Sequence, residues 1–173
     1  MGVDLRVVSD VSPFLLALAV AVIATVVWWS GSRREPPGAF EDMTSPPWSD
    51  AIAKARGSVP TLRELFPAHR GRIAVKFPLQ TSRGELEHVW GELLELGQDS
   101  FVAGLDTPPR RGKPVGRPPY TLALSELEDW QLEMPDGAIR GGYTTRLDLE
   151  RARERGQAIP DHILAMESRF VDP

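Results

Sequence analysis

The chain has 173 residues, a net charge of −4 and no cysteine. Without cysteine there are no disulfides, thiolate zinc sites or cysteine nucleophiles. Residues 1–34 carry a net charge of +1, while the remaining 17 basic and 22 acidic residues leave −5 on the rest of the chain. An acidic body is a poor general binder of nucleic acid, so no nucleic-acid partner is expected.

The N-terminal region contains an uncharged apolar run at residues 11–29, VSPFLLALAVAVIATVVWW. A membrane-spanning helix needs about 20 apolar residues, and Trp28 and Trp29 suit the membrane interface. A cleaved signal peptide and a buried core helix are the alternatives. The run follows one Arg and two Asp and lacks a small-residue cleavage site, which argues against cleavage. We predict a single retained transmembrane helix over 11–30, after a short tail at 1–10.

The charges that flank this helix predict its orientation. Arg33 and Arg34 follow it closely, whereas the preceding flank is nearly neutral. The positive-inside rule therefore favours a single-pass protein of the bacterial inner membrane with its domain in the cytoplasm rather than the periplasm. Residues 31–47 contain two Pro-Pro pairs and few apolar residues, which predicts a semi-extended tether.

Two short helices are expected before the first strand. Ser49 is a candidate cap for a helix over Asp50–Arg56 that ends at Gly57. Thr61–Glu64 has the spacing of a capping box, and Pro67 would limit the second helix. The expected buried face of this pair consists of Ile52, Leu62, Leu65 and Phe66.

The segment Arg72–Pro78 alternates as a half-buried strand does. Its apolar side carries Ile73, Val75 and Phe77, and its polar side carries Arg72 and Lys76. A turn over 81–84 follows.

Residues 85–96 fit both a helix and a strand. A helical stripe is formed by Leu86, Val89, Trp90, Leu93 and Leu94. Gly91 is costly inside a helix, and residues 97–99 followed by 100–105 indicate a hairpin return. Read as a strand, one face carries Leu86, His88, Trp90, Leu94 and Leu96, with Glu92 as a misfit.

Residues 107–119, TPPRRGKPVGRPP, contain five prolines, four basic residues and no acid. This composition predicts an exposed loop. One hypothesis for the loop is contact with anionic lipid headgroups or an acidic partner. The basic residues concerned are Arg110, Arg111, Lys113 and Arg117.

The rest of the chain predicts short strands and then helices. Strands are expected over 120–124, 130–134 and 138–140, and residues 125–129 are expected to form a turn or a single helical turn. The tight turn at 135–137 contains Pro-Asp-Gly.

Two helices are expected after these strands. Thr145 is a candidate cap for a helix over Leu147–Arg155. A last helix from Pro160 has Ile163, Leu164 and Met166 as its apolar contacts. Residues 156–173 would then be a C-terminal helical extension of a domain over 48–155.

Five sequence elements, in order, are shared with one known family. They are Val75–Pro78, Glu87–Trp90, Phe101–Leu105, Glu128–Trp130 and Gly141–Thr144. Over residues 48–150 the chain resembles the YegJ C-terminal-like domain, a bacterial family of unknown function. The chain departs from the family at Gly116-Arg117, where members often carry Gly-Asp.

The resemblance implies an α+β domain with a small, strongly curved antiparallel sheet and flanking helices. It favours a long, bulged strand over 85–96. It implies no known reaction and no cofactor, and it fits interaction better than catalysis.

His88 and Asp129 are the candidates for acid–base catalysis. A catalytic histidine needs a partner that orients it. On a strand, neighbouring Glu87 and His88 point to opposite faces, so Asp129 would have to orient His88. The alternative is a half-buried histidine hydrogen-bonded within the sheet. His69, His88 and His162 lack the spacing of metal ligands, and no metal is expected.

A protein-binding surface is the other candidate site. Trp90, Trp130 and Tyr143 are its aromatic candidates, and Gly141 and Gly142 would let another chain's backbone approach. The alternative is that these residues fill the core or a turn. The basic loop adds Arg110, Arg111 and Arg117.

We expect a membrane-anchored protein-interaction module, in envelope maintenance or in immunity against a toxin or phage. One alternative is a small acid–base enzyme that uses His88 and Asp129. The other is a binder of anionic lipid headgroups that uses the basic loop.

Overall fold

The computed structural model describes residues 45–106 and 108–171. All of these residues belong to one unit of the chain, 36–173. The transmembrane helix predicted for 11–30 lies outside the described residues, as does most of the tether. Among the helices of 45–171, none combines the length and the apolar character that a membrane crossing requires.

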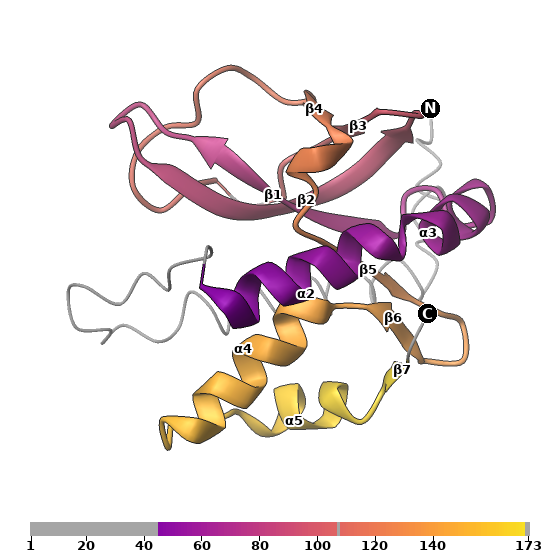
Figure 1. Ribbon diagram of the computed structural model, residues 1–173, viewed down its shortest axis with the longest axis vertical. Helices are drawn as coiled ribbons and strands as arrows, with labels where there is room; N and C mark the ends of the chain where they lie inside the picture. Colours follow the sequence, from indigo (N-terminus) through magenta and orange to yellow (C-terminus); the bar gives the residue numbers. More distant parts are fainter. Residues whose placement is uncertain (1–44, 107, 172–173) are drawn as a thin grey trace, which may run out of the picture. The chain divides into compact units, whose positions relative to one another are not determined.

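The described unit is an α+β domain built on a seven-stranded sheet with the order β4-β3-β2-β1-β5-β6-β7 (Figure 1). All neighbouring strands are antiparallel except β6 and β7. The strands are β1 (Ile73–Gln80), β2 (Leu86–Leu96), β3 (Ser100–Ala103), β4 (Tyr120–Ala123), β5 (Asp129–Glu133), β6 (Ile139–Gly141) and β7 (Phe170–Val171).

Within the described residues, four α-helices and two 3-10 helices accompany the sheet. They are α2 (Pro46–Gly57), α3 (Val59–Leu65), η1 (Phe66–Ala68), η2 (Leu124–Glu126), α4 (Tyr143–Glu154) and α5 (Asp161–Glu167). Helix α2 packs against α4 and β5. In Figure 1, α4 and α5 lie below α2, on the opposite side from β1–β4.

The main hydrophobic core lies on one face of β1. Ile73, Val75 and Phe77 are buried there, and their strand partners Leu132, Trp130 and Val89 belong to the same cluster. Burial of these side chains is the main stabilising term of such a fold. The predicted alternation of β1 is therefore confirmed on its apolar side.

A second set of buried hydrophobic residues belongs to helices α2, α4 and α5 and to β6. It comprises Trp48, Ala51, Ile52, Ala55, Ile139, Leu149, Ala152, Ile163 and Met166. Ile52, Leu62 and Phe66 are buried as predicted, and Leu65 is partly buried. Leu164 of α5 was expected to pack inward but is 40% exposed.

Strand β2 confirms the strand interpretation of residues 85–96, including the bulge. The pairing with β3 shifts register between Leu93 and Glu95. Val89 and Leu93 are buried, whereas Leu94, at the bulge, is exposed. Because the bulge reverses the alternation, Leu96 returns to the core side, opposite buried Phe101. The predicted strand face is therefore confirmed for Leu86, His88, Trp90 and Leu94 and wrong for Leu96.

Lys76 lies on the expected side of β1 but is buried rather than exposed. Trp48 of α2 lies beneath its ammonium group, 5.3 Å from ring centroid to Nζ, and Thr144 of α4 accepts its hydrogen bond at 3.4 Å. Strand β1 is therefore covered on both sides at this point, and the prediction of a half-buried strand is wrong there.

Three helices begin earlier than their predicted caps. Helix α2 begins at Pro46, directly after Ser45, rather than after the predicted cap Ser49. Proline is tolerated in the first turn of a helix, so Pro46 and Pro47 do not prevent this earlier start. Helix α3 follows Ser58 and contains Thr61, so the capping box does not form. Helix α4 follows Gly142, so Thr145 lies inside its first turn.

The C-terminal segment contributes more than a helix. After α5 the chain adds β7 beside β6, with Ile139 opposite Phe170. The turn at Pro135–Gly137 forms as predicted: the amide of Gly137 donates to the carbonyl of Met134 at 2.9 Å. Gly137 has a φ of +88°, which glycine adopts without strain.

Gly91 is expected to be the least replaceable residue of β2. A Cβ atom at this position would lie 2.0 Å from the carbonyl oxygen of Gly104 and 3.2 Å from the ring of Phe77. We expect Gly91→Ala to lower the free energy of unfolding by at least about 3 kcal/mol. Urea denaturation of the 36–173 unit, followed by far-UV circular dichroism, measures this loss.

Gly57→Ala is the matched control. A Cβ atom there meets nothing within 4 Å, so the change is expected to be neutral or to stabilise the unit by up to about 0.5 kcal/mol. Equal stability of the two variants would contradict the steric argument at Gly91.

Candidate functional site

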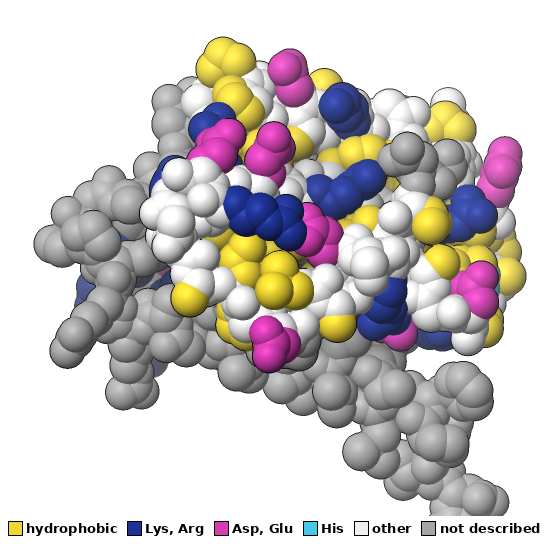
Figure 2. All heavy atoms as spheres, turned by 90° about the horizontal axis from the view of Figure 1, so that it is seen from below, with side chains coloured by type: hydrophobic (Ala, Val, Ile, Leu, Met, Phe, Trp, Pro, Cys, Tyr) yellow, Lys and Arg dark blue, Asp and Glu magenta, His cyan; other side chains and the backbone are white. Residues whose placement is uncertain are grey.

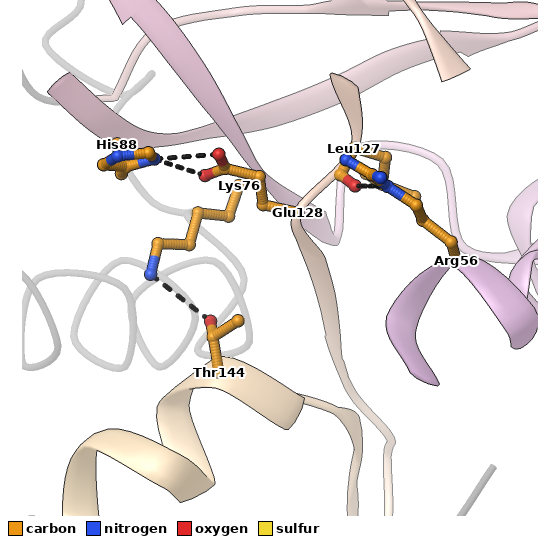
Figure 3. A network of polar contacts seen from close by, with 6 residues as sticks. All are labelled: Arg56, Lys76, His88, Leu127, Glu128 and Thr144. Atoms are coloured by element: carbon orange, nitrogen blue, oxygen red, sulfur yellow. Dashed lines mark hydrogen bonds and ion pairs between the residues drawn. The ribbon is translucent and has the colours of Figure 1, made fainter. Parts of the chain in front are cut away.

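The structure pairs His88 with Glu128, which directly precedes the predicted partner Asp129 in the sequence. Both carboxylate oxygens of Glu128 lie 2.8 Å from Nδ1 of His88 (Figure 3). The Glu128 side chain is 8% exposed and the His88 side chain 29%. Because a carboxylate only accepts hydrogen bonds, a neutral His88 carries its proton on Nδ1. Its Nε2 atom is then a hydrogen-bond acceptor and a potential base.

Glu128 is held in place by the backbone of β1. Its amide donates to the carbonyl of Lys76 at 2.9 Å, directly before β5 begins at Asp129. His88 belongs to β2, where it lies opposite Pro78. The pair therefore joins two strands that are not neighbours, across the strand between them.

Lys76 extends past this pair toward α4. Figure 3 shows its side chain directed toward Thr144. Its position over the Trp48 ring gives a cation–π contact. A buried ammonium group is costly unless it is paired, and the carboxylate of Asp129 is the opposite charge near it.

Asp129 has a structural position that excludes it as the partner of His88. It is fully buried, and its Oδ1 accepts the amide protons of Trp130 and Tyr143 at 2.8 and 3.1 Å. Its Oδ2 accepts the amide and hydroxyl protons of Thr144 at 2.7 and 2.8 Å. Burial raises the pKa of Asp129, and the hydrogen bonds of Thr144 and the charge of Lys76 oppose that rise. The carboxylate caps α4 from a neighbouring strand.

The two tryptophans of the predicted binding surface lie on opposite faces of the sheet. Trp90 is paired with Lys76 and Trp130 with Val75, and these two β1 residues are consecutive. Trp130 is completely buried and donates from Nε1 to the hydroxyl of Ser58 at 2.8 Å. Trp90 is half-buried. The alternative of a core residue therefore holds for Trp130.

The double glycine permits close approach, but by residues of this chain. A Cβ on Gly141 would lie 2.1 Å from the carbonyl oxygen of Trp130, and one on Gly142 would lie 2.4 Å from the ring of Phe170. Tyr143 is half-buried, with the guanidinium of Arg146 5.1 Å from its ring centroid. No space is left at Gly142 for the backbone of another chain.

The basic loop is exposed as predicted, yet its backbone is held against the end of the β1–β2 hairpin. Glu87 accepts the amide protons of Arg110 and Arg111 at 2.7 and 2.5 Å. The carbonyl of Lys113 accepts the amide proton of Ser82 at 2.8 Å. The side chains of Arg110, Arg111 and Arg117 remain exposed.

The sequence analysis did not identify three members of these sites. Glu128 was part of the family signature but was given no role, although it directly precedes Asp129. Trp48 and Thr144 contact the ammonium group of Lys76. These three residues are far apart in the chain, so no local sequence pattern connects them. Over the described stretch of the chain, no three His, Cys, Asp or Glu residues gather as metal ligands do.

Comparison of the chain with protein-family models, characterised proteins and solved structures finds no match. The resemblance to the YegJ C-terminal-like domain therefore stays a prediction.

Replacing Asp129 by Asn tests its capping role. The carboxamide would direct an NH₂ group at amide donors that now reach a carboxylate oxygen, and it would leave Lys76 without its counter-charge. We expect a loss of about 3 kcal/mol in the free energy of unfolding of the 36–173 unit, measured by urea denaturation.

Asp136→Asn is the control for this experiment. Asp136 is exposed, and its Oδ1 accepts the amide proton of Ala138 at 3.0 Å, a bond that an asparagine oxygen keeps. This variant is expected to stay within about 0.5 kcal/mol of the wild type. A loss as small as this in Asp129→Asn would refute the capping role.

Proposed function

We propose that the chain is a membrane-anchored protein-interaction module whose α+β domain binds a protein partner through the side of β2 that faces away from the main core. The observation that supports this most directly is the exposure of Leu94, at 38%, on the same strand as half-buried Trp90 and His88. We call Trp90 and Leu94 the β2 face.

Three properties of the β2 face suit a partner site. Tryptophan is enriched among the residues that dominate binding energy at protein interfaces. The strand beneath is 11 residues long and belongs to the middle of the sheet, so the surface is rigid. Leu94 alternates with buried Leu93 and lies at the bulge, so it presents an apolar side chain to solvent on the same side as Trp90.

The proposed setting comes from the sequence. A single-pass helix over 11–30 would hold the domain at the bacterial inner membrane, on its cytoplasmic side. The resemblance to the YegJ C-terminal-like domain supports an interaction role rather than a known reaction. Envelope maintenance and immunity against a toxin or phage are the two settings that fit such a module.

A photocross-linking experiment tests the partner site in cells. A photoactivatable phenylalanine analogue is placed at Leu94 of the full chain, and a discrete cross-linked product with a second protein is expected. Trp90→Ala should reduce that product about tenfold or more, since an anchor residue contributes at least about 1.4 kcal/mol.

The same analogue at Leu164 is the control position. Leu164 has a similar exposure but belongs to α5. Identical products from both positions, or a product unaffected by Trp90→Ala with an unchanged fold, would reject the β2 face as the site.

The His88–Glu128 pair supports a second candidate, a small acid–base enzyme. A buried carboxylate that orients a partly exposed histidine is an arrangement that general-base catalysis uses. Here Glu128 takes the role that the sequence analysis assigned to Asp129. The interaction role is preferred because Trp90 and Leu94 present apolar surface on the same strand.

His88→Ala separates the two candidates. In an enzyme the change should abolish the cellular function while the fold and the cross-link from Leu94 persist. An interaction module should retain its function in His88→Ala and lose it in Trp90→Ala. Complementation of a deletion strain, together with the cross-linking yield, gives both readings.

A further inference from the structure

The free end of the β1–β2 hairpin combines positive charge with exposed apolar side chains. Five exposed cationic residues lie on the hairpin turn and on the loop bound to it: Arg83, Arg110, Arg111, Lys113 and Arg117. Two carboxylates interact with the loop: Glu85 pairs with Arg111, and Glu87 accepts the backbone amide protons of Arg110 and Arg111. The end is therefore positive in a chain whose net charge is −4.

Two of the most exposed large apolar residues of the described chain belong to the same end. Leu86 is 57% exposed and Val115 is 50% exposed. Leu86 is paired with Gln80 on one side of β1. On the other side, the amide of Val115 donates to the carbonyl of Gln80 at 2.9 Å, next to the bridge between Thr81 and Pro114.

This pairing forms a row across three extended segments. Neighbouring strands are spaced by about 4.8 Å, so Leu86 and Val115 flank Gln80 roughly 10 Å apart. Figure 1 shows the loop between β3 and β4 arching beside the β1–β2 hairpin. The loop thus adds a third segment to the hairpin end and carries both its charge and one of its two apolar residues.

We infer that this hairpin end, formed by the five cationic residues with Leu86 and Val115, docks onto the surface of an anionic lipid bilayer. Cationic side chains near an anionic membrane are each worth about 1 kcal/mol. Apolar side chains beside them enter the boundary between headgroups and acyl chains. The two residue types are needed together, and this end of the domain presents them together.

The face of the domain seen in Figure 2 lacks this character. Basic and acidic side chains are interspersed there rather than gathered by sign. Arg153 and Glu167 form an ion pair between α4 and α5, and Arg151 pairs with Glu154. These ion pairs bring opposite charges together, unlike the clustered cations of the hairpin end.

The inference rests in part on the proposed membrane anchoring, which would keep the hairpin end close to a bilayer. An acidic protein is the competing occupant. The membrane is preferred because Leu86 and Val115 are separated side chains at a protruding end, which suits insertion between lipids better than a continuous protein contact.

Because the chain has no cysteine, the test uses single-cysteine labelling of the full chain. Val115→Cys carries an environment-sensitive fluorophore, and Leu164→Cys on α5 is the reference position. The labelled chains are reconstituted into vesicles of phosphatidylcholine, alone or mixed equally with phosphatidylglycerol. We expect a blue shift at Val115→Cys in the anionic vesicles, its reversal by high salt, and no shift at Leu164→Cys.

A charge-neutralised variant tests the cause of the shift. The triple change Arg83→Gln, Lys113→Gln and Arg117→Gln should weaken docking roughly fivefold for each charge removed. This is measured as the anionic-lipid fraction needed for half of the blue shift. The control removes the same number of charges elsewhere, at Lys54, Arg151 and Arg155, and should leave the shift unchanged.

Three results would overturn the inference: no shift in anionic vesicles, an equal shift at Leu164→Cys, or equal effects of the two triple variants. A shift produced by polyglutamate but not by vesicles would assign the hairpin end to an acidic protein instead. Flotation of the chain with phosphatidylcholine vesicles reports the anchor separately, so failure of the anchor and failure of the hairpin end are distinguishable.

Discussion

The carboxylate of Asp129 connects the sheet to the helices, and much of the arrangement depends on it. It lies at the start of β5, beside Lys76 of β1, and accepts the first amide protons of α4. The first amides of a helix have no partner within that helix. A carboxylate fixed on the sheet satisfies them, so α4 must begin at Tyr143. Helix α4 in turn supports α2, whose Trp48 closes over Lys76. Removal of one charge would therefore affect both layers.

Gly141 and Gly142 act together with the carboxylate of Asp129 at the start of α4. Gly142 precedes α4 with a φ of +70°, and Gly141 approaches the backbone of Trp130 too closely for any side chain. These conformations let the chain turn from β6 into α4 within two residues. Such tight geometry explains a Gly-Gly-Tyr-Thr sequence through the fold alone. A functional interpretation of Gly141 and Gly142 is therefore unnecessary.

Local patterns predicted the strands well because each strand side faces either the core or solvent. The alternation of Ile73, Val75 and Phe77, and the Pro-Asp-Gly turn, depend on neighbouring residues only. The errors arose where a distant residue decides the outcome. Lys76 was expected to be exposed because Trp48 and Thr144 are remote in sequence. The start of α4 was misplaced because the residue that caps it is Asp129, which is remote in sequence. The partner of His88 was misassigned because Glu128 and Asp129 are consecutive, and the sequence alone does not show which of them contacts His88 and which caps α4.

The bulge at Leu94 and the loop bound to the hairpin have a joint consequence for function. Exposed apolar side chains lie near each end of this 11-residue strand, Leu86 beside the loop and Leu94 at the bulge. An extended strand rises about 3.3 Å per residue, so Leu86 and Leu94 are separated by roughly 26 Å. A partner on the β2 face and a bilayer at the hairpin end would therefore not compete for the same surface. Docking of the hairpin end would instead fix the angle at which the β2 face is presented, which reduces the orientational freedom that a partner must remove on binding.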